Sequence, residues 1–265
     1  LTFAAGREVV ATLGLTDWDD ISTLTHTLRL VKSDEEQALM RAAAKASDAG
    51  TLAAIATIHD GATEAEVAAE CTAAMIRAGS NPPGFGPFIR PEHRIAEEHT
   101  TWGDGTYKAG GRVMLELAGC VSRYHAPMGR LIHIGQIRDE DAAMAEISKR
   151  AFVASLKGLR TGRKAREVYA DWQAVVDAAG MPHYRRHHCG YLVGLGMAPS
   201  WTGGNSVTGL RHDSDLELRE GMTFHLLSWF TGTGRGDHFV SNTALLGANG
   251  PELLTKAPMG PTVVR

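Results

Sequence analysis

The chain has 265 residues, 43% hydrophobic and 22% charged, and a formal net charge of −3. This composition is typical of a globular protein of one large domain or two small ones. The small net charge, without a Lys/Arg block, argues against a nucleic-acid partner, and no apolar run approaches the ~20 residues of a membrane helix. The widely spaced Cys71, Cys120 and Cys189 suit a reducing compartment, so we expect a cytoplasmic protein.

The first 28 residues differ from the rest. Residues 1–13 read as the end of a helix and are followed by a polar connection. Because the chain starts at Leu1 rather than Met, we expect an upstream segment to be missing or removed.

Four helices are predicted from caps and periodicity. Ser/Thr followed three residues later by Glu predicts helix starts at the beginning of residues 33–58 and of residues 63–78. Two further helices are expected over residues 138–160, where Thr161-Gly162 ends the pattern, and over residues 165–179.

The strands are predicted to arrive as hairpins. Residues 113–130 (VMLELAGCVSRYHAPMGR) indicate two strands and a bend, and residues 183–195, 222–230 and 238–246 are strand-like. Residues 85–102 look extended and polar. Hairpins without βαβ units favour an α+β fold with a mostly antiparallel sheet, and the two similar halves suggest an internal pseudo-repeat.

The hairpin over residues 113–130 carries polar groups where paired strands should be apolar. Glu116 interrupts an apolar run, and Arg123, His125 and Arg130 follow on the second strand. A buried carboxylate is costly unless it is paired or protonated, so this cluster predicts a functional site. The competing interpretation is a structural Glu116 paired with Arg123 or Arg130.

Several segments together resemble the catalytic domain of the pita-bread (M24-type) family, which includes aminopeptidase P, prolidase, creatinase and ectoine hydrolase. They are RLVKSDEEQALMRAAAKASDAG, the hairpin, CGYLVGLG, LELREGMTF and TALLGANGPELLT. The resemblance implies a curved, mostly antiparallel sheet flanked by helices with an internal pseudo-two-fold. It also implies a catalytic domain at 29–265, a remnant of a creatinase-type N-terminal domain with its linker at 1–28, and a homodimer.

The metallopeptidases of this family hold two metal ions with two Asp, one His and two Glu. By resemblance these positions fall at Glu116, Pro127, Tyr191, Leu227 and Ser241, or at Phe239 or Asn242 in place of Ser241 if the register shifts. At most one carboxylate remains, whereas two divalent cations need several anionic or imidazole ligands. We therefore expect no metal, no other cofactor and no peptidase activity.

Within the family, the chain is most similar to the metal-free ectoine hydrolase branch. Creatinase carries Glu at the position of Gly129, His at Tyr191 and Glu at Leu227, which makes creatine a poor candidate substrate. The resemblance implies metal-independent hydrolysis of a non-peptide C–N bond in a small molecule, ectoine or a related cyclic amidine. Two other hypotheses are a non-catalytic domain that binds a peptide or protein, and, ranked last, lyase chemistry.

Three residues are predicted to be catalytic. Glu116 would attack the amidine carbon or activate water, and His99, at the family's proton-shuttling position, would act as acid/base. His125 would hydrogen-bond the tetrahedral intermediate or orient Glu116. The competing interpretations are a surface-loop His99 and a structural His125 bonded to backbone.

Other residues are predicted to bind substrate. Tyr191, in a glycine turn, would hydrogen-bond the tetrahedral intermediate or orient Glu116. His225, two residues before Leu227, would point to the same face of its strand as Leu227, because side chains alternate along a strand. One of Arg90, Arg94 or Arg130 would hold a substrate carboxylate. Packed, structural roles for Tyr191 and His225 stay open.

Three tempting motifs are given structural interpretations. His187-His188 is not taken as a metal site, because neighbours on a strand point to opposite faces. Thr231–Gly236 is glycine-rich but lacks the Lys-Ser/Thr of a phosphate loop. Trp201 and Trp229 are expected in the core or an interface rather than in a pocket.

Overall fold

The computed structural model describes residues 2–16, 19, 21–202 and 207–265. Its body is an eight-stranded sheet with the order β1-β2-β3-β6-β5-β4, to which β7 adds beside β6 and β8 beside β3. Among the described strands only β3 and β8 pair in parallel. The expected α+β fold is therefore confirmed. The strands are β1 (Phe88–Pro91), β2 (Arg112–Val121), β3 (Tyr124–Ile134), β4 (Gly190–Leu192), β5 (Thr223–Phe230), β6 (His238–Gly247), β7 (Gly250–Leu253) and β8 (Thr262–Val264).

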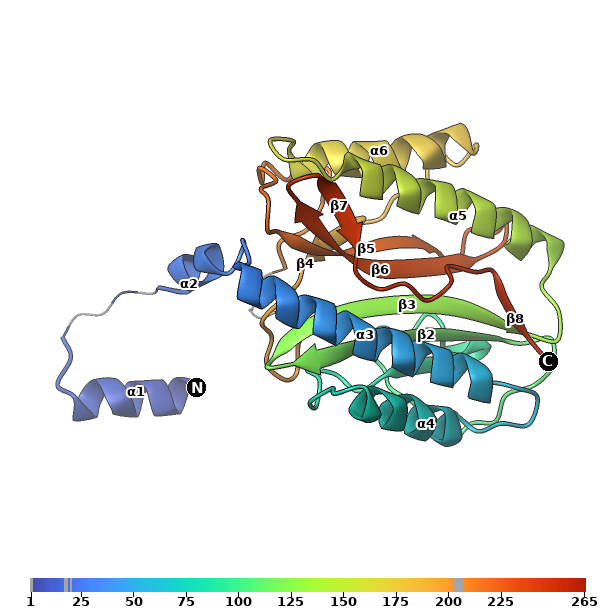
Figure 1. Cartoon of the computed structure of the whole chain (residues 1–265), viewed down its shortest axis with the longest axis horizontal. Helices are drawn as coiled ribbons and strands as arrows, with labels where there is room; N and C mark the ends of the chain where they lie inside the picture. Colours follow the sequence, from blue (N-terminus) through green and yellow to red (C-terminus); the bar gives the residue numbers. More distant parts are fainter. Residues whose placement is uncertain (1, 17–18, 20, 203–206) are drawn as a thin grey trace.

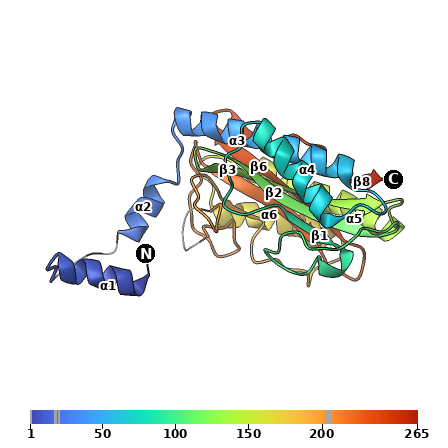
Figure 2. The same cartoon turned by 90° about the horizontal axis from the view of Figure 1, so that it is seen from below.

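Four helices cover the sheet in two pairs (Figures 1 and 2). They are α3 (Asp34–Thr57), α4 (Glu64–Arg77), α5 (Asp139–Gly158) and α6 (Ala165–Ala178). Helix α3 packs on β2 and β3 with α4 beside it, and α5 packs on β5 and β6 with α6 beside it. Each half thus runs helix, helix, strand, hairpin, and the halves meet where Gly129 of β3 pairs with Ser241 of β6.

Both predicted capping boxes are present. The Ser33 hydroxyl accepts a hydrogen bond from the Glu36 amide at 3.3 Å, and the Glu36 carboxylate accepts one from the Ser33 amide at 2.7 Å. Thr63 and Glu66 make the same exchange at the start of α4. Because these reciprocal bonds satisfy backbone donors that a helix start leaves free, the sequence located both starts correctly.

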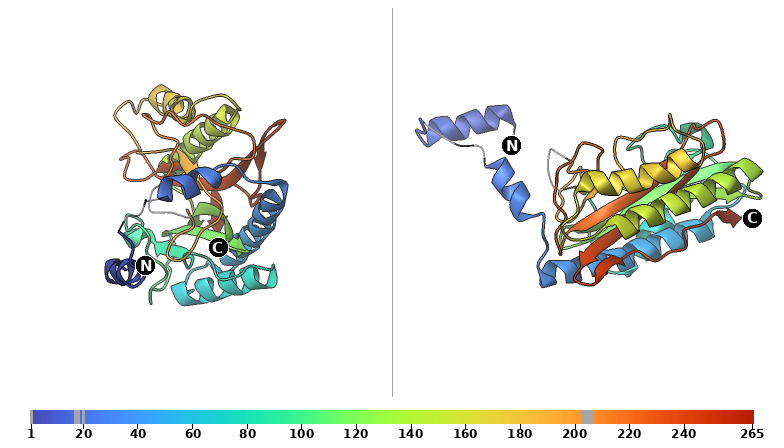
Figure 3. Two further views of the ribbon diagram at one scale, coloured as in Figure 1. Left: turned by 90° about the vertical axis from the view of Figure 1, so that its left-hand side faces the viewer. Right: turned by 90° about the horizontal axis from the view of Figure 1, so that it is seen from above.

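The N-terminal segment forms α1 (Phe3–Thr12) and α2 (Ser22–Leu28). Neither helix buries a residue, and α1 projects away from the body in the right-hand view of Figure 3. The stretch 29–32 is a linker without strand pairing. No helix in the described part of the chain is both long and apolar enough to span a membrane.

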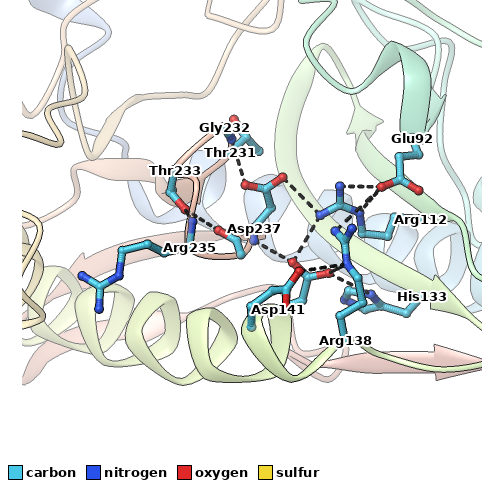
Figure 4. Close-up of polar contacts among 12 residues, drawn as sticks. Glu92, Arg112, His133, Arg138, Asp141, Thr231, Gly232, Thr233, Arg235 and Asp237 are labelled. Atoms are coloured by element: carbon cyan, nitrogen blue, oxygen red, sulfur yellow. Dashed lines mark hydrogen bonds and ion pairs between the residues drawn. The ribbon is translucent and has the colours of Figure 1, made fainter.

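Arg112, at the start of β2, is the centre of a partly buried ion-pair network (Figure 4). Its guanidinium donates to Glu92 at 2.6 Å, to Asp237 at 3.1 Å and to Asp141 at 3.3 Å. Asp141, at the start of α5, also accepts from Arg138 at 2.8 Å. These five residues, here called the Arg112 network, join β2 of the first half to α5 and the β5–β6 loop of the second.

Candidate active site

A cavity of about 430 Å³ lies over the middle of the sheet. Its walls are largely aromatic, with Phe85, Tyr191, Trp201 and Trp229 among the lining residues. Its ionisable lining residues are Glu98, His99, Glu116, His187, His188 and Arg211. A concave, mostly apolar site with a few converging polar groups has the character of a small-molecule binding site.

Four residues far apart in sequence form one row across the sheet. Glu116 of β2 pairs with Gly129 of β3, Gly129 pairs with Ser241 of β6, and Ser241 pairs with Leu227 of β5. Directly opposed residues in antiparallel strands project to the same face. The register therefore gathers these four positions on one side of the sheet, and Glu116 and Leu227 both line the cavity.

Glu116 is a buried carboxylate in this cavity. It is 8% exposed, and its Oε1 lies 3.9 Å from Nε2 of His225. The predicted alternative, pairing with Arg123 or Arg130, is wrong, because both guanidiniums donate elsewhere. Burial raises the pKa of Glu116 to about 7, against the opposing influence of the Arg90 guanidinium. A carboxyl group with such a pKa can accept and release a proton near neutral pH.

His225 lies behind Glu116 in a chain of hydrogen bonds. Its Nδ1 is 2.8 Å from the Tyr191 hydroxyl, and its Nε2 is 2.7 Å from the Ser241 hydroxyl. The Trp201 indole N–H donates to the same Tyr191 oxygen at 3.0 Å. Complete burial lowers the pKa of His225 well below its usual value, so this imidazole is neutral. Among the residues joined by these hydrogen bonds, Tyr191 and Trp201 line the cavity.

His99 also lines the cavity, from an exposed loop. Its backbone has φ = 56°, a left-handed conformation that costs energy for a residue with a side chain. Its ring stacks on Phe85 at 5.7 Å and meets the edge of Phe88 at 5.7 Å. These contacts hold the imidazole over the cavity, where a proton donor could reach a ligand.

The structure places His125 outside the cavity lining. Its Nε2 accepts a hydrogen bond from the Gly84 amide at 2.8 Å, and its own amide donates to the Gly194 carbonyl at 2.9 Å. Gly84 in turn packs closely against the Ser200 carbonyl. The placement of His125 therefore supports its structural interpretation. Its hydrogen bond to Gly84 holds the loop that supports the cavity wall, and His125 does not contact Glu116.

Arg130 is also remote from the cavity, because it follows Gly129 and so projects from the other face of β3. Its guanidinium donates to the carbonyls of Gly129, Ser241, Ala257 and Pro258 and to the Asn242 side chain. With these donors committed to backbone, the geometry does not support Arg130 as a carboxylate clamp.

Arg90 has a different environment. It lies on the Glu116 face of the sheet, since Phe88 pairs with Glu116 and Arg90 with Met114. It is 1% exposed, its Nη2 contacts the Met114 sulfur at 2.8 Å, and its Nε and Nη1 have no partner among the described residues. Arg90 is not among the lining residues, so its predicted contact with substrate stays a prediction. Arg94 is engaged in ion pairs with Glu64 and Glu97.

Sequence reasoning missed the contribution of the His187-His188 pair. Both rings line the cavity, 4.2 Å apart, because residues 187–189 precede β4 and are not strand. The argument from strand alternation was therefore wrong for this pair. Burial lowers the pKa of His188 to about 3 and also lowers that of His187, so both are neutral. Trp201 lies in the core as expected and Trp229 packs against it, but both also line the cavity.

The residues at the five positions where the family's metallopeptidases carry metal ligands do not fit a metal centre. Leu227 and Pro127 offer no side-chain ligand, and the hydroxyls of Tyr191 and Ser241 are bonded to His225. Glu116 is the one carboxylate at the five positions, and no cluster of three or more His, Cys, Asp or Glu in the described residues is arranged to hold a metal. This donor set lacks the charge that divalent cations need.

Comparisons with known proteins agree on one family. The chain is 27% identical over 255 residues to the ectoine hydrolase of Halomonas elongata, covering 90% of this chain and 61% of that protein. It is 25% identical over 240 residues to the Xaa-Pro dipeptidase of Pyrococcus furiosus, covering 91% of this chain and 67% of that protein. The X-Pro aminopeptidase structure from Thermotoga maritima superposes with a TM-score of 0.87 at 21% identity, covering all of this chain and 72% of that one.

The chain thus spans about three fifths of the length of the ectoine hydrolase that it resembles. The model of metallopeptidase family M24 matches residues 38–245, which is most of the sequence. The curved antiparallel sheet with paired helices is the architecture shared by the structural neighbours. The protein belongs to metallopeptidase family M24 and has the pita-bread fold.

Proposed function

We propose that the protein is a metal-independent hydrolase of a non-peptide C–N bond in a small molecule, with ectoine or a related cyclic amidine as substrate. One observation carries the proposal: a buried carboxylate, Glu116, faces the cavity, while the other four ligand positions hold Leu, Pro and hydroxyl side chains. The similarity to an ectoine hydrolase supports it, although the similarity to a Xaa-Pro dipeptidase is almost as great.

The cavity suits a small planar cation. Glu98 and Glu116 provide negative charge, and the lining cation Arg211 is itself paired with Asp213 at 3.2 Å. The face of Trp201 attracts cations that lie against it, whereas the Trp229 ring already carries the Arg186 guanidinium 4.2 Å from its centroid. An amidinium ring combines delocalised positive charge with a flat shape, so it complements both features.

The chemistry follows from the positions of Glu116 and His99. Ionised Glu116 takes a proton from a water molecule as the water oxygen bonds to the amidine carbon. The C–N bond of the tetrahedral intermediate then breaks, and its electron pair stays on the leaving nitrogen. His99, which lines the same cavity, gives that nitrogen a proton, while the hydroxyl on the carbon becomes the amide carbonyl and passes its proton to solvent. Glu116 then releases to solvent the proton that it took from the water molecule, and His99 takes up another from solvent.

The test is a turnover assay by NMR with ectoine, hydroxyectoine, creatine and a Xaa-Pro dipeptide, together with metal analysis after dialysis. We expect ring opening of ectoine or hydroxyectoine that a chelator does not inhibit. Cleavage of the dipeptide, or stoichiometric Mn, Co or Zn with chelator-sensitive activity, would contradict the proposal. Lack of turnover of all four would favour the non-catalytic binding domain.

A further inference from the structure

Four buried side chains form a continuous hydrogen-bonded chain at the edge of the cavity. It runs from Trp201 to Tyr191 at 3.0 Å, from Tyr191 to His225 at 2.8 Å, and from His225 to Ser241 at 2.7 Å. The exposed fractions of these four residues are between 0% and 9%. Because water has little access, the chain must satisfy its own donors.

Counting protons in this chain leaves two arrangements. An indole N–H can only donate, so the Tyr191 oxygen accepts from Trp201 in both. In the first arrangement Tyr191 donates to Nδ1 of His225, and Nε2–H donates to Ser241. In the second, Ser241 donates to Nε2, and Nδ1–H donates to Tyr191.

Each arrangement leaves one hydroxyl proton without an acceptor within the hydrogen-bonded chain, and the two arrangements differ in which hydroxyl that is. Among the described residues, His225 is the one hydrogen-bond partner of the Ser241 hydroxyl oxygen, and Ser241 is fully buried. The first arrangement therefore strands the Ser241 proton in the interior, which costs about 1–3 kcal/mol. The second uses that proton and leaves over only the Tyr191 proton, which can point into the cavity that Tyr191 lines.

We infer that Tyr191 is a hydrogen-bond donor to the reacting group, and that Trp201, His225 and Ser241 are positioning residues that aim it. Ser241 holds His225 in the Nδ1–H tautomer. Trp201 and His225 then both donate hydrogen bonds to the Tyr191 oxygen. The remaining Tyr191 proton faces the ligand space beside Glu116. This inference rests on the proposed function for the identity of the acceptor, which is the oxygen that water adds to the amidine carbon.

The geometry around the rings supports this fixed arrangement. The Tyr191 and His225 rings meet edge to face at 5.2 Å with an interplanar angle of 88°. The Trp201 and His225 rings meet at 6.2 Å and 89°. Such contacts restrain ring rotation, so the phenol reaches the ligand already oriented.

The tautomer of His225 can be measured without any substrate. Long-range ¹H–¹⁵N NMR of histidine-labelled protein shows which ring nitrogen carries the proton, and the signals of His225 are those absent from His225→Gln. We expect the proton on Nδ1 in the wild type. In Ser241→Ala the Nε2 atom loses its donor and the Glu116 carboxylate, 3.9 Å away, is the nearest group to it, so we expect the proton on Nε2 there. A wild-type proton on Nε2 would overturn the inference, whatever the enzyme turns over.

The kinetic test is a double-mutant cycle on ectoine turnover. Tyr191→Phe should lower kcat by roughly 10²-fold with little change in KM, because one donor to the intermediate is lost. Ser241→Ala should lower kcat by about tenfold or more, and the double variant should match Tyr191→Phe, because both changes act through one hydroxyl. Additive effects, or a loss confined to KM, would contradict the inference.

Ser228→Ala is the matched control. Ser228 is a buried serine on β5, but it faces Trp172, whose indole donates to it at 3.2 Å. Ser228→Ala is thus the same chemical change as Ser241→Ala, made on the helix side of the sheet, and kcat should stay at the wild-type value. If no substrate is turned over at all, the proposed function fails, while the NMR experiment still decides the tautomer.

Discussion

Strand β2 carries two charged residues four positions apart, Arg112 and Glu116, in opposite electrostatic situations. Arg112 contacts three carboxylates within 3.3 Å. Among the described residues no cation lies that close to Glu116, and the basic group nearest to its carboxylate is the neutral His225 at 3.9 Å. A fully paired buried charge maintains structure, whereas an unpaired one raises the energy of its ionised form and keeps it reactive. The comparison assigns stability to the first residue of β2 and chemistry to its middle.

The largest effect should come from Glu116→Gln. We expect turnover to fall by at least ~10³-fold, about 4 kcal/mol in the activation barrier, because the amide cannot accept a proton from water. At pH 8 the variant should unfold at a higher temperature than the wild type, since the substitution removes a buried ionised group. Near-normal turnover would refute the catalytic role, and a lower melting temperature would refute the electrostatic contrast.

Arg112→Met should act in the opposite way. It leaves Asp141, which is 0% exposed, with one cation fewer, so we expect a loss of about 3–5 kcal/mol in the free energy of unfolding. Urea unfolding measures this loss, while KM of the folded fraction should stay close to wild type. Arg138→Met is the matched control: that side chain is 46% exposed, so the cost should be about 1 kcal/mol or less.

His99→Ala should lower turnover by roughly 10²-fold, the lower range for a general acid, because the side chain is on an exposed loop. Stability should change little. His93→Ala is the control, since His93 belongs to the same polar segment but does not line the cavity around Glu116. Equal effects of the two substitutions would remove His99 from the mechanism.

The most gradual effect is the pH dependence of stability. The pKa of Glu116 is raised to about 7, so the folded state holds a proton that the unfolded state releases near pH 4.5. Relative to Glu116→Gln, wild-type stability should therefore fall as pH rises to about 7, by at most ~1.4 kcal/mol per pH unit, and then level off. Over the same range kcat/KM should rise. Parallel stability curves for the two proteins would show that Glu116 titrates normally.

The sequence predicted much of the fold because its signals are local. Capping boxes at Ser33 and Thr63 set helix starts by bonds to residues three positions away. Apolar, strand-like stretches next to turns indicated β2, β3, β5 and β6. The sequence also placed Glu116, His99 and Tyr191 in one site, because the family's motifs fix their places in the fold.

The remaining site residues depend on facts that no local pattern carries. Arg130 fails as a ligand for substrate because one step along β3 turns it to the other face. His187 and His188 share a face because the chain there is irregular, and strand alternation does not apply. Trp201 follows a loop whose path is set by Gly84 and His125, which lie more than seventy residues earlier.

The row formed by Glu116, Gly129, Ser241 and Leu227 has a consequence for redesign. Backbone ladders hold neighbouring strands about 4.8 Å apart, so the four positions keep their spacing whatever side chains they carry. Evolution or an engineer can therefore exchange the chemistry here without rebuilding the scaffold. Carboxylates introduced at the positions of Leu227 and Ser241 would add two acidic metal ligands to Glu116. The metal affinity of such a variant would show whether these changes are enough or whether surrounding side chains must change as well.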